Sequence, residues 1–376
     1  MYHRMVLPVL TIFLLFLYSL LLNWYYRSWK EIPVYTPSSA MHLPIQVSII
    51  IPARNEEKNI GPLLEALQNQ RYPASFTEII VVDDHSTDAT VTIVQEYSHI
   101  RLLSLQDEGI NSYKKKAVET GIKAATGELI ITTDADCIPG PAWLSTLVSF
   151  YQEEEAVFIA APVAFTAGHN LPEKFQELDF LVLQGITAAV VHKGVQSLCN
   201  GANMAYTRKV FDEVEGFSGI DRIASGDDML LMHKIRKRYP EKTRYLLSPD
   251  AIMQTAPMPD WSSFFQQRIR WASKATFYQE KGITAVLLLV YLLNLCLLLF
   301  VFTAFAHPLN LAYFLGGWIL KTVVEWPFVA AVARFYKKEK RMRAFFFFQP
   351  LHILYTVLSG LLGQTGRYEW KGRKVK

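Results

Sequence analysis

Ile79-Ile80-Val81-Val82-Asp83-Asp84 is a run of four branched aliphatic residues that ends in two carboxylates. A second apolar run, Val47 to Ile51, leads into Pro52. A third, Leu129 to Thr133, leads into Asp134. Short continuous apolar runs that stop at polar or turn residues are typical of buried strands in a parallel sheet. We therefore predict three such strands in one sheet.

The segments around these strands complete an alternating pattern. Apolar residues recur at helical spacing between residues 60 and 67, and Asp88 offers a helix start before Val91. Residues 100–105 form a further strand-like run. Alternating strands and helices predict an α/β domain with a mainly parallel sheet and right-handed crossovers, extending from residue 46 to residue 281.

Polar residues gather at the predicted ends of the strands. Three clusters lie there, at residues 52–56, 83–84 and 134–136. In open parallel sheets, ligands bind beyond the carboxyl ends of the strands. We therefore expect the three clusters to converge on one edge of the sheet as a nucleotide-binding site.

Asp134 and Asp136 flank the small residue Ala135 directly after a predicted strand. Two such carboxylates can hold a hard divalent cation, Mg²⁺ or Mn²⁺, and leave positions open for phosphate oxygens. The cation would neutralise the charge that builds on a departing diphosphate. Because an Asp-x-Asp triplet also occurs in ordinary loops and caps, its position after a strand is what favours a metal site.

Four other charged groups have two interpretations each. Asp83 and Asp84 either close a turn or accept hydrogen bonds from a uracil imide or a ribose hydroxyl, which we favour. Lys114 either belongs to a solvated helix face or reaches donor phosphates as a point charge. Asp228, which follows Asp227 at a predicted helix start, either caps that helix or takes the proton of an attacking hydroxyl as a general base.

Gln267, Arg270 and Trp271 lie on a predicted amphipathic helix just before an apolar segment. Arg270 can bind a diphosphate through charge-assisted hydrogen bonds, and Trp271 offers a flat face to a sugar or a lipid. The same composition fits an interfacial helix with snorkelling arginines. Both interpretations remain open for this segment.

Hydrophobic residues make up 51% of the 376 residues and gather at both ends of the chain. Val6 to Trp24 is long enough to cross a bilayer, and no small-residue cleavage pattern follows it, so we favour an anchor over a signal peptide. Arg27 and Lys30 place the following domain on the cytoplasmic side. The net charge of +4 lies mostly beside apolar stretches, which favours orientation in a bilayer over nucleic-acid binding.

Two more apolar stretches follow the α/β domain, at residues 284–306 and 309–333. The second contains Lys321 and Glu325, which are four residues apart and so share one helix face. We expect these two side chains to pair away from lipid. Three cysteines without metal-type spacing predict neither a zinc site nor a disulfide framework.

The basic run from Lys337 to Arg343 is a marker of the cytoplasmic side. The apolar stretch after it, residues 344–363, has basic flanks on both sides and is either a span or a re-entrant or interfacial segment. We therefore predict three parts: an anchor and linker in residues 1–45, the α/β domain in residues 46–281, and a membrane region of two or three apolar segments with a basic tail in residues 282–376.

Taken in order, these motifs resemble the membrane-bound branch of glycosyltransferase family 2, over about residues 46–280. The matching stretches are residues 48–56 (SIIIPARNE), 81–88 (VVDDHSTD), 134–136 (DAD), 200–206 (NGANMAY), 226–228 (GDD), Gln267-x-x-Arg270-Trp271 and the tail at 369–373 (EWKGR). The resemblance departs at two positions: Asp227 stands where Glu is frequent, and His85 stands where Gly is frequent.

The resemblance implies a GT-A fold and an inverting, single-displacement sugar transfer that depends on Mg²⁺ or Mn²⁺. With the analysis above, it leads to four groups of candidate residues. The donor-binding candidates are Pro52, Ala53, Asn55, Glu56, Asp83, Asp84, Lys114, Asp134 and Ala135. The metal-ligand candidates are Asp136 and Asp134, and the candidate bases are Asp228 and Asp227. The candidates for the diphosphate and acceptor side are Asn200, Gly201, Asn203, Gln267, Arg270 and Trp271.

We expect an integral protein of a cell membrane, bacterial in type, whose cytoplasmic domain moves a sugar from a nucleotide-sugar, expected to be a UDP-sugar. The expected acceptor is a lipid, a lipid-linked molecule or a saccharide, and no nucleic acid is expected as a partner. A processive polysaccharide synthase is one alternative, which the small number of apolar segments disfavours. A non-catalytic membrane nucleotide-binding protein is another, which the full set of carboxylates disfavours.

Overall fold

The computed structural model describes residues 2–38, 43–107, 109–110, 112–221, 223, 226–273, 280–364, 368–370 and 373–375. The chain forms two compact units, each built from segments that are distant in sequence. The helical unit comprises Met1–Glu31, Ala167–Ala189 and Pro257–Tyr368. The sheet unit comprises Ile32–Thr166, Val190–Ala256 and Glu369–Lys376.

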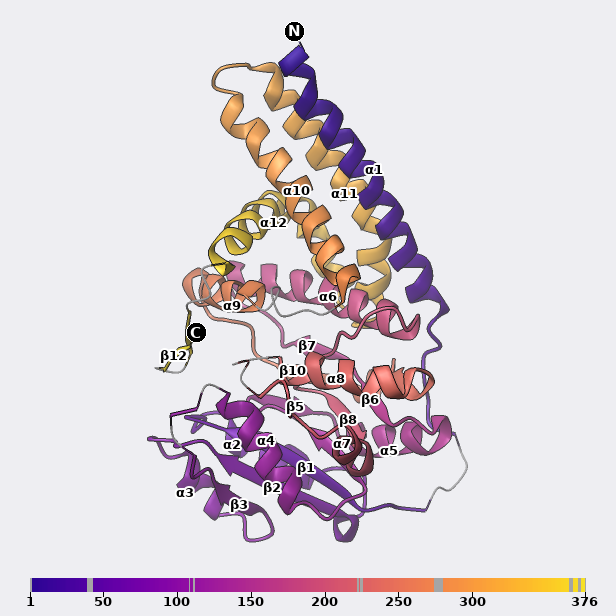
Figure 1. Ribbon diagram of the computed structural model, residues 1–376, viewed down its shortest axis with the longest axis vertical. Coiled ribbons are helices and arrows are strands. Elements are labelled where there is room, and N and C mark those ends of the chain that lie inside the picture. Colours follow the sequence, from indigo (N-terminus) through magenta and orange to yellow (C-terminus); the bar gives the residue numbers. More distant parts are fainter. Residues whose placement is uncertain are drawn as a thin grey trace. The chain divides into compact units, whose positions relative to one another are not determined.

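A seven-stranded sheet forms the centre of the sheet unit (Figure 1). Its strands, in spatial order, are β3 (Arg101–Ser104), β2 (Thr77–Asp83), β1 (Val47–Ala53), β4 (Leu129–Thr132), β8 (Met204–Thr207), β6 (Phe158–Ala160) and β9 (Thr243–Tyr245). Strand β8 is antiparallel to both of its neighbours, and the other pairs are parallel. The predicted α/β fold with a mainly parallel sheet is confirmed.

The predicted strands owe their central place to continuous apolar sequence. Ile49, Ile50 and Ile51 are completely buried, as expected for a strand covered on both faces. Each predicted strand is present, with ends that differ by no more than two residues from the predicted ones. A second sheet of three short strands consists of β5 (Cys137–Pro139), β10 (Met253–Thr255) and β7 (Val163–Phe165).

The same unit also contains several helices. They are α2 (Ile60–Gln68), α3 (Thr90–Gln95), α4 (Tyr113–Ala124), α5 (Trp143–Glu154), α7 (Arg208–Glu213) and α8 (Asp227–Arg238). Helix α4 packs on β1 and β2, α7 on β8, and α8 on β6 and β9. On α2, the four apolar residues with helical spacing are all buried, as predicted. Short 3₁₀ turns lie at Ala74–Phe76, Pro240–Lys242 and Pro249–Ala251.

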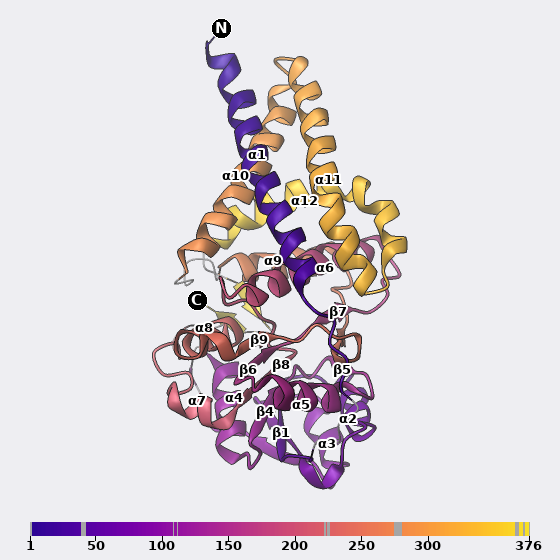
Figure 2. The ribbon, with the colours of Figure 1, turned by 90° about the vertical axis from the view of Figure 1, so that its right-hand side faces the viewer.

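The helical unit contains α1 (Tyr2–Glu31), most of α6 (Leu171–His192), α9 (Trp261–Ser273), α10 (Lys281–Thr303), α11 (Leu309–Phe335) and α12 (Met342–Gly363), the last preceded by a 3₁₀ turn at Glu339–Arg341. Helices α1, α10 and α11 lie side by side (Figure 2). Helices α6 and α9 belong to this unit although they lie within the predicted α/β segment. They do so because Phe175 of α6 and Phe264 of α9 share a buried cluster with Tyr355 of α12. Two short C-terminal strands, β11 (Tyr368–Trp370) and β12 (Arg373–Val375), pair with each other.

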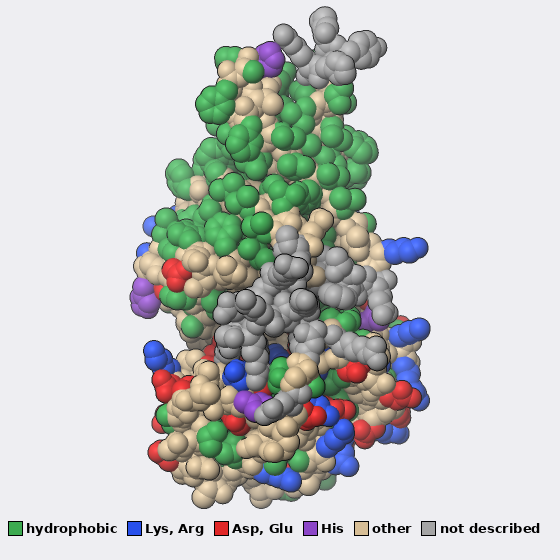
Figure 3. Space-filling model, turned by 60° about the vertical axis from the view of Figure 1, so that its left-hand side comes forward, with side chains coloured by type: hydrophobic (Ala, Val, Ile, Leu, Met, Phe, Trp, Pro, Cys, Tyr) green, Lys and Arg blue, Asp and Glu red, His purple; other side chains and the backbone are tan. Residues whose placement is uncertain are grey.

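Four helices of this unit are long and apolar enough to cross a membrane: Met5–Glu31, Lys281–Thr303, Leu309–Phe335 and Glu339–Gly363. Hydrophobic side chains cover much of the helical unit in the view of Figure 3. Exposed apolar residues of α1 include Phe13 and Phe16. Exposed apolar area of this extent is typical of a protein that contacts lipid. The fourth stretch, whose status the sequence left open, meets the same criterion of length and composition.

A buried polar cluster lies among the apolar helices. Lys321 Nζ lies 2.6 Å from Glu325 Oε1, so the predicted pairing of these two residues is confirmed. Lys321 also donates to Gln349 Oε1 at 2.6 Å, and Tyr18 donates to Glu325 Oε1 at 2.5 Å. Charges inside an apolar bundle are tolerated when they are paired and hydrogen-bonded in this way.

Candidate functional site

The register of the large sheet brings four chain segments to one edge. Ala53 of β1 pairs with Asp83 of β2, so the loops after both strands start at the same level. Thr132 of β4 pairs with Ile50 of β1 and with Met204 of β8. Because β8 is antiparallel, the loop that precedes it meets the loop that follows β4. The predicted clusters therefore converge at this edge.

Asn55 ties the loop after β1 to the loop after β2. Its backbone N–H donates to Ser86 Oγ at 3.0 Å, and its side-chain Oδ1 accepts from the N–H of Thr87 at 2.8 Å. The residue has a φ of 50°, in the left-handed region that asparagine tolerates better than most residues. Asn55 therefore shapes the loop as well as facing the edge.

The two carboxylates after β2 are largely buried. Asp83 accepts hydrogen bonds from the N–H of Ser86 at 3.2 and 3.3 Å, and Asp84 Oδ1 lies 3.0 Å from His85 Nδ1. Arg54 braces this turn from the neighbouring loop, donating to the carbonyl oxygens of Asp84 and His85 at 2.7 and 3.0 Å. No role for Arg54 follows from the sequence alone, because its spacing does not indicate these backbone partners.

The remaining predicted residues of the first loop are closely packed. Pro52 is half-buried, whereas Ala53 is 2% exposed and its carbonyl accepts from the N–H of Asp84 at 2.8 Å. The N–H of Glu56 donates to Thr90 Oγ1 at 2.7 Å, and its carboxylate accepts from Asn59 at 2.7 Å. These contacts fix the loop that borders the edge.

Lys114 of α4 links the carboxylates of two different segments. Its Nζ lies 2.6 Å from Asp134 Oδ1, in the loop after β4, and 3.3 Å from Asp227 Oδ2, at the start of α8. Burial by itself lowers the pKa of Lys114, but the negative charges of Asp134, Asp227 and Asp228 and the hydrogen bond to Asp134 outweigh it and raise this pKa above its ordinary value. The lysine is therefore charged and acts as a counter-ion.

Asp228 reaches the same place from the first turn of α8. Its Oδ2 accepts from the N–H of Gly201 at 3.2 Å, and its Oδ1 accepts from the N–H of Met229 at 2.8 Å. Gly226, directly before the helix, has a φ of 78°, which glycine adopts without steric cost. The positive end of the helix dipole favours carboxylates at this position. The structure thus brings Asp134, Lys114 and both aspartates of α8 together.

The loop before β8 contains one accessible and one buried asparagine. Asn200 Oδ1 accepts from the N–H of Ala202 at 3.0 Å. Asn203 is completely buried: its Oδ1 accepts from Trp143 Nε1 at 2.9 Å, and its Nδ2 donates to two backbone carbonyls at 2.7 and 2.8 Å. Asn203 therefore anchors the loop that presents Gly201, and its own amide does not reach the edge.

Asp136 and Asp134 lie in a tight turn after β4, with the buried Ala135 between them. The N–H of Cys137 donates to the carbonyl of Asp134 at 3.2 Å. Burial, with the charges of these two aspartates, raises the pKa of the Cys137 thiol, so this cysteine stays protonated. Cys137, Cys199 and Cys296 form no disulfide bond in the part of the chain that the structure describes.

Among the residues that the structure describes, no three His, Cys, Asp or Glu side chains come together as ligands for one ion. The donor set at Asp134 and Asp136 nevertheless fits Mg²⁺ or Mn²⁺. Mg²⁺ is usually bound through one or two carboxylates, with phosphates and water as its other ligands. Both side chains are half-buried and remain accessible to such a ligand.

Gln267, Arg270 and Trp271 lie on α9, in the helical unit, and are half-buried. A residue between them, Arg268, is 4% exposed and contacts two of the three: it donates to Gln267 Oε1 at 3.0 Å and stacks over the Trp271 ring at 4.2 Å. Arg268 is not among the residues predicted from the sequence. Its position inside the motif was the only available signal.

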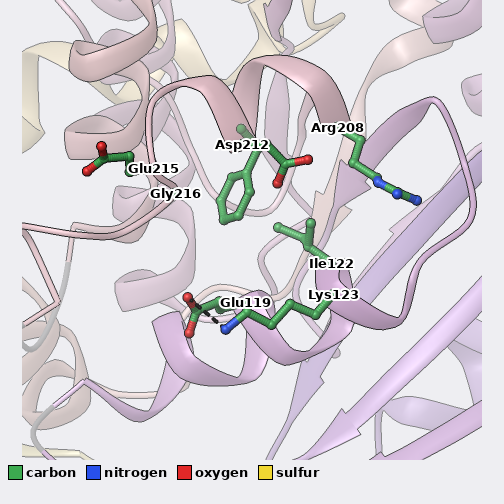
Figure 4. A pocket seen from close by; sticks show the side chains of 8 residues that line it. Glu119, Ile122, Lys123, Arg208, Asp212, Glu215 and Gly216 are labelled. Atoms are coloured by element: carbon green, nitrogen blue, oxygen red, sulfur yellow. Dashed lines mark ion pairs between the residues drawn. The ribbon is translucent and has the colours of Figure 1, made fainter.

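A separate pocket of about 330 Å³ lies between α4 and α7 in the sheet unit (Figure 4). Glu119 and Lys123, which pair at 3.2 Å, line one side, and Arg208 and Asp212 line the other. None of its lining residues is among the predicted site residues. This pocket therefore supplies control positions for the experiments below.

Comparison with known proteins points to one family. Residues 48–215 match the family described as "Glycosyl transferase family 2". The chain is 28% identical over 234 residues to "Probable glycosyltransferase YdaM" of Bacillus subtilis, covering 60% of this chain and 54% of that protein. It is 35% identical over 118 residues to "Dodecaprenyl-phosphate galacturonate synthase" of Rhizobium johnstonii, covering 30% of this chain and 34% of that protein. The chain thus spans about half of the length of these relatives, or less.

Among solved structures, the mannosyltransferase PcManGT from Pyrobaculum calidifontis, in complex with GDP-Man and Mn²⁺, is similar with a TM-score of 0.63. The alignment covers 95% of this chain and 99% of that one at 19% sequence identity. A similarity at this identity concerns the fold, which is GT-A-like: an α/β fold with a mostly parallel sheet.

Proposed function

We propose, from the premise that residues 48–215 form a domain of glycosyl transferase family 2, that this protein transfers a sugar from a nucleotide-sugar to a lipid or lipid-linked acceptor at the cytoplasmic face of a membrane. The observation that carries the proposal is the pairing of Lys114 with Asp134 and Asp227 at the carboxyl edge of the sheet, with Asp228 next to Asp227 and bonded to the N–H of Gly201. This is the edge where α/β sheets bind their ligands.

The donor's nucleotide is proposed to lie over the loops after β1 and β2. Asp83 and Asp84 offer carboxylate acceptors for an imide or a ribose hydroxyl. Asn55, Arg54 and Glu56 hold the two loops in place through the contacts described above. A preorganised loop loses less conformational entropy on binding than a mobile one, which favours affinity.

Asp134 and Asp136 are proposed to hold Mg²⁺ or Mn²⁺ beside the donor's diphosphate, where the ion would neutralise the leaving charge. Lys114 adds a second positive charge next to Asp134. Its ammonium group is compact and has three donors, which suits phosphate oxygens. The pyrophosphate would thus face two cations.

Asp228 is proposed as the base, with Asp227 as the neighbour that holds Lys114. In an inverting transfer, the acceptor oxygen forms a bond to the anomeric carbon while the bond to the diphosphate oxygen breaks. The hydroxyl proton passes to the Asp228 carboxylate, which the N–H of Gly201 orients at 3.2 Å. General-base assistance of this kind typically contributes about 10²- to 10⁴-fold to the rate.

The apolar helices support a lipid or lipid-linked acceptor, since such a substrate is retained in a bilayer. Relatives named for lipid-linked substrates match this chain over part of its length, including the dodecaprenyl-phosphate galacturonate synthase. A processive polysaccharide synthase remains the alternative. The described residues contain four candidate spans, which are few for an export channel, and this favours single transfer.

The test is a screen of UDP- and GDP-sugars with membrane lipid extract as acceptor, in the presence and absence of Mn²⁺. We expect one donor to be consumed with formation of a single glycolipid. Asp136→Ala and Asp228→Asn should lower this turnover by about 10²-fold or more. The matched control is Asp212→Asn, an exposed carboxylate of the separate pocket, which should keep full turnover. Full turnover in Asp136→Ala would contradict the proposal, and a ladder of products would favour the processive alternative.

A further inference from the structure

The side chain of Arg268 is a buried cation at the meeting point of three helices. Its Nη2 lies 2.7 Å from Asp179 Oδ2 of α6, and both side chains are 4% exposed. The other oxygen, Asp179 Oδ1, accepts from the hydroxyl of Tyr355 of α12 at 2.5 Å. His352 lies beside the same carboxylate, with its Nε2 4.0 Å from Asp179 Oδ1. The arginine is therefore held by α6, and α6 is held by α12.

The same guanidinium contacts the side chains on either side of it along α9. It donates to Gln267 Oε1 at 3.0 Å and lies over the Trp271 ring at 4.2 Å, with Phe264 on another side at 4.8 Å. A guanidinium is planar and has five donors, so it can pair with a carboxylate and stack on a ring at the same time. An ion pair that fixes the guanidinium therefore also fixes the orientations of Gln267 and Trp271.

We propose that Arg268, Asp179 and Tyr355 are positioning residues that hold Gln267, Arg270 and Trp271 of α9 in the arrangement that sugar transfer requires. This inference rests on the proposed function. The three residues act through the α9 side chains and do not themselves contact the substrates. An arrangement held by buried, paired groups is expected for a site in which small displacements cost much of the rate.

The structure offers a matched control on the same helix. Glu177 lies two residues before Asp179 on α6 and is also a buried, ion-paired carboxylate, 1% exposed in its side chain. Its partners are Lys338 and Arg341, each at 2.6 Å, at the turn between α11 and α12. Loss of Glu177 therefore removes a comparable ion pair without a contact to the α9 motif.

The experiment compares Asp179→Asn, Tyr355→Phe and Arg268→Lys with Glu177→Gln in the full-length protein in lipid nanodiscs. Three quantities are measured: kcat for transfer, the Kd of UDP and GDP, and hydrogen exchange of the α9 amides. We expect Asp179→Asn to lower kcat about 10- to 100-fold, because a misplacement of this kind costs up to two orders of magnitude. Tyr355→Phe, which removes one hydrogen bond, should lower kcat by a smaller factor.

Arg268→Lys keeps the positive charge but loses the stacking on Trp271, so it should also lower kcat. This variant keeps the inference testable if Asp179→Asn does not fold. The Kd of the nucleotide should stay within about twofold in all variants, because the residues proposed to hold the nucleotide belong to the sheet unit and are not replaced. Glu177→Gln should keep its kcat. Equal kcat values in Asp179→Asn and Glu177→Gln would overturn the inference.

Failure of the proposed function gives a different result. In that case the wild-type protein consumes no donor, and hydrogen exchange decides the inference. Faster exchange of α9 in Asp179→Asn than in Glu177→Gln supports the positioning role, and equal exchange in the two variants overturns it.

Discussion

Lys114 occupies the position between carboxylates that a divalent cation would approach. Its ammonium group already neutralises Asp134 at 2.6 Å and Asp227 at 3.3 Å. A cation that binds Asp134 must therefore compete with this lysine, and the lysine then becomes available to phosphate. One residue would thus oppose the metal ion before the donor arrives and support the diphosphate afterwards.

We expect Lys114→Gln to separate these two effects. Without donor, Mn²⁺ should bind about three- to fivefold more tightly, which corresponds to the loss of a partly exposed ion pair of up to about 1 kcal/mol. With metal present, the KM of the donor should rise, because a positive charge beside the diphosphate is lost. Electron paramagnetic resonance of free Mn²⁺ measures the first effect, with Lys123→Gln as the control. Weaker Mn²⁺ binding in Lys114→Gln would contradict this prediction.

His85 stands at a position where glycine is frequent in the family that the sequence resembles, and its backbone conformation explains that preference. The residue has a φ of 55°, a left-handed conformation that glycine adopts at lower steric cost. Glycine is therefore expected to be frequent at this position because the backbone is left-handed there. Here the histidine is held in this conformation by Asp84, which lies 3.0 Å from its Nδ1, and by the Arg54 hydrogen bond to its carbonyl.

At the scale of the elements, the placement of Lys114 depends on the contact between α4 and the sheet. Gly121 lies where this contact is closest: a Cβ added there would lie 2.5 Å from Ile50 Cγ2 and 3.2 Å from Val82 Cγ2. Gly61 on α2 has no such constraint, since its nearest atoms would be 3.8 and 4.0 Å away. The two glycines therefore offer a matched pair of substitutions.

We expect Gly121→Ala and Gly61→Ala to change stability in opposite directions. A glycine replaced by alanine inside a helix usually stabilises it by up to about 1 kcal/mol. At Gly121, overpacking against β1 and β2 should reverse the sign and destabilise the sheet unit by about 1–3 kcal/mol. Chemical denaturation followed by the far-ultraviolet signal measures both. A stabilised Gly121→Ala variant would show that α4 does not pack as closely as described.

At the scale of the whole molecule, the helical unit combines the two ends of the chain with a middle segment. Helix α1 packs with α10 and α11, although about 250 residues separate them in sequence. Each of these helices covers part of the apolar surface of the other two, because helices in a membrane associate by packing against one another. Helix α1 is therefore part of one bundle with α10 and α11.

If α11 spans the membrane, its two ends lie on opposite sides. We expect a cysteine placed at Lys340 to react with a membrane-impermeant maleimide only from the cytoplasmic side, and a cysteine at His307 only from the other side. Both positions are exposed. Cys199 is replaced by Ser beforehand, because it is partly exposed. Cys137 and Cys296 are buried and are left in place. Labelling of both positions from one side would contradict a spanning α11.

Much of the fold could be predicted because it depends on local pattern. Continuous runs such as Ile79 to Val82 are buried on both faces wherever they lie in a parallel sheet, so composition is enough to identify them. The carboxylates that follow were predicted to converge because the carboxyl ends of parallel strands share one edge. The Lys321–Glu325 pair was predicted because helical geometry places residues four apart on one face.

Other features followed from contacts between distant segments, which no local pattern contains. Asn203 has the same type of side chain as Asn200, yet only the packing of Trp143 decides that it is buried and not at the edge. Arg268 and Asp179 are 89 residues apart, and their pairing depends on how α6 and α9 pack together. The amino-acid sequence by itself determined the strands, the apolar helices and the chemistry available at the edge, because these depend on neighbouring residues. Only the tertiary structure decided which of the polar groups meet, because their partners come from elements brought together by packing.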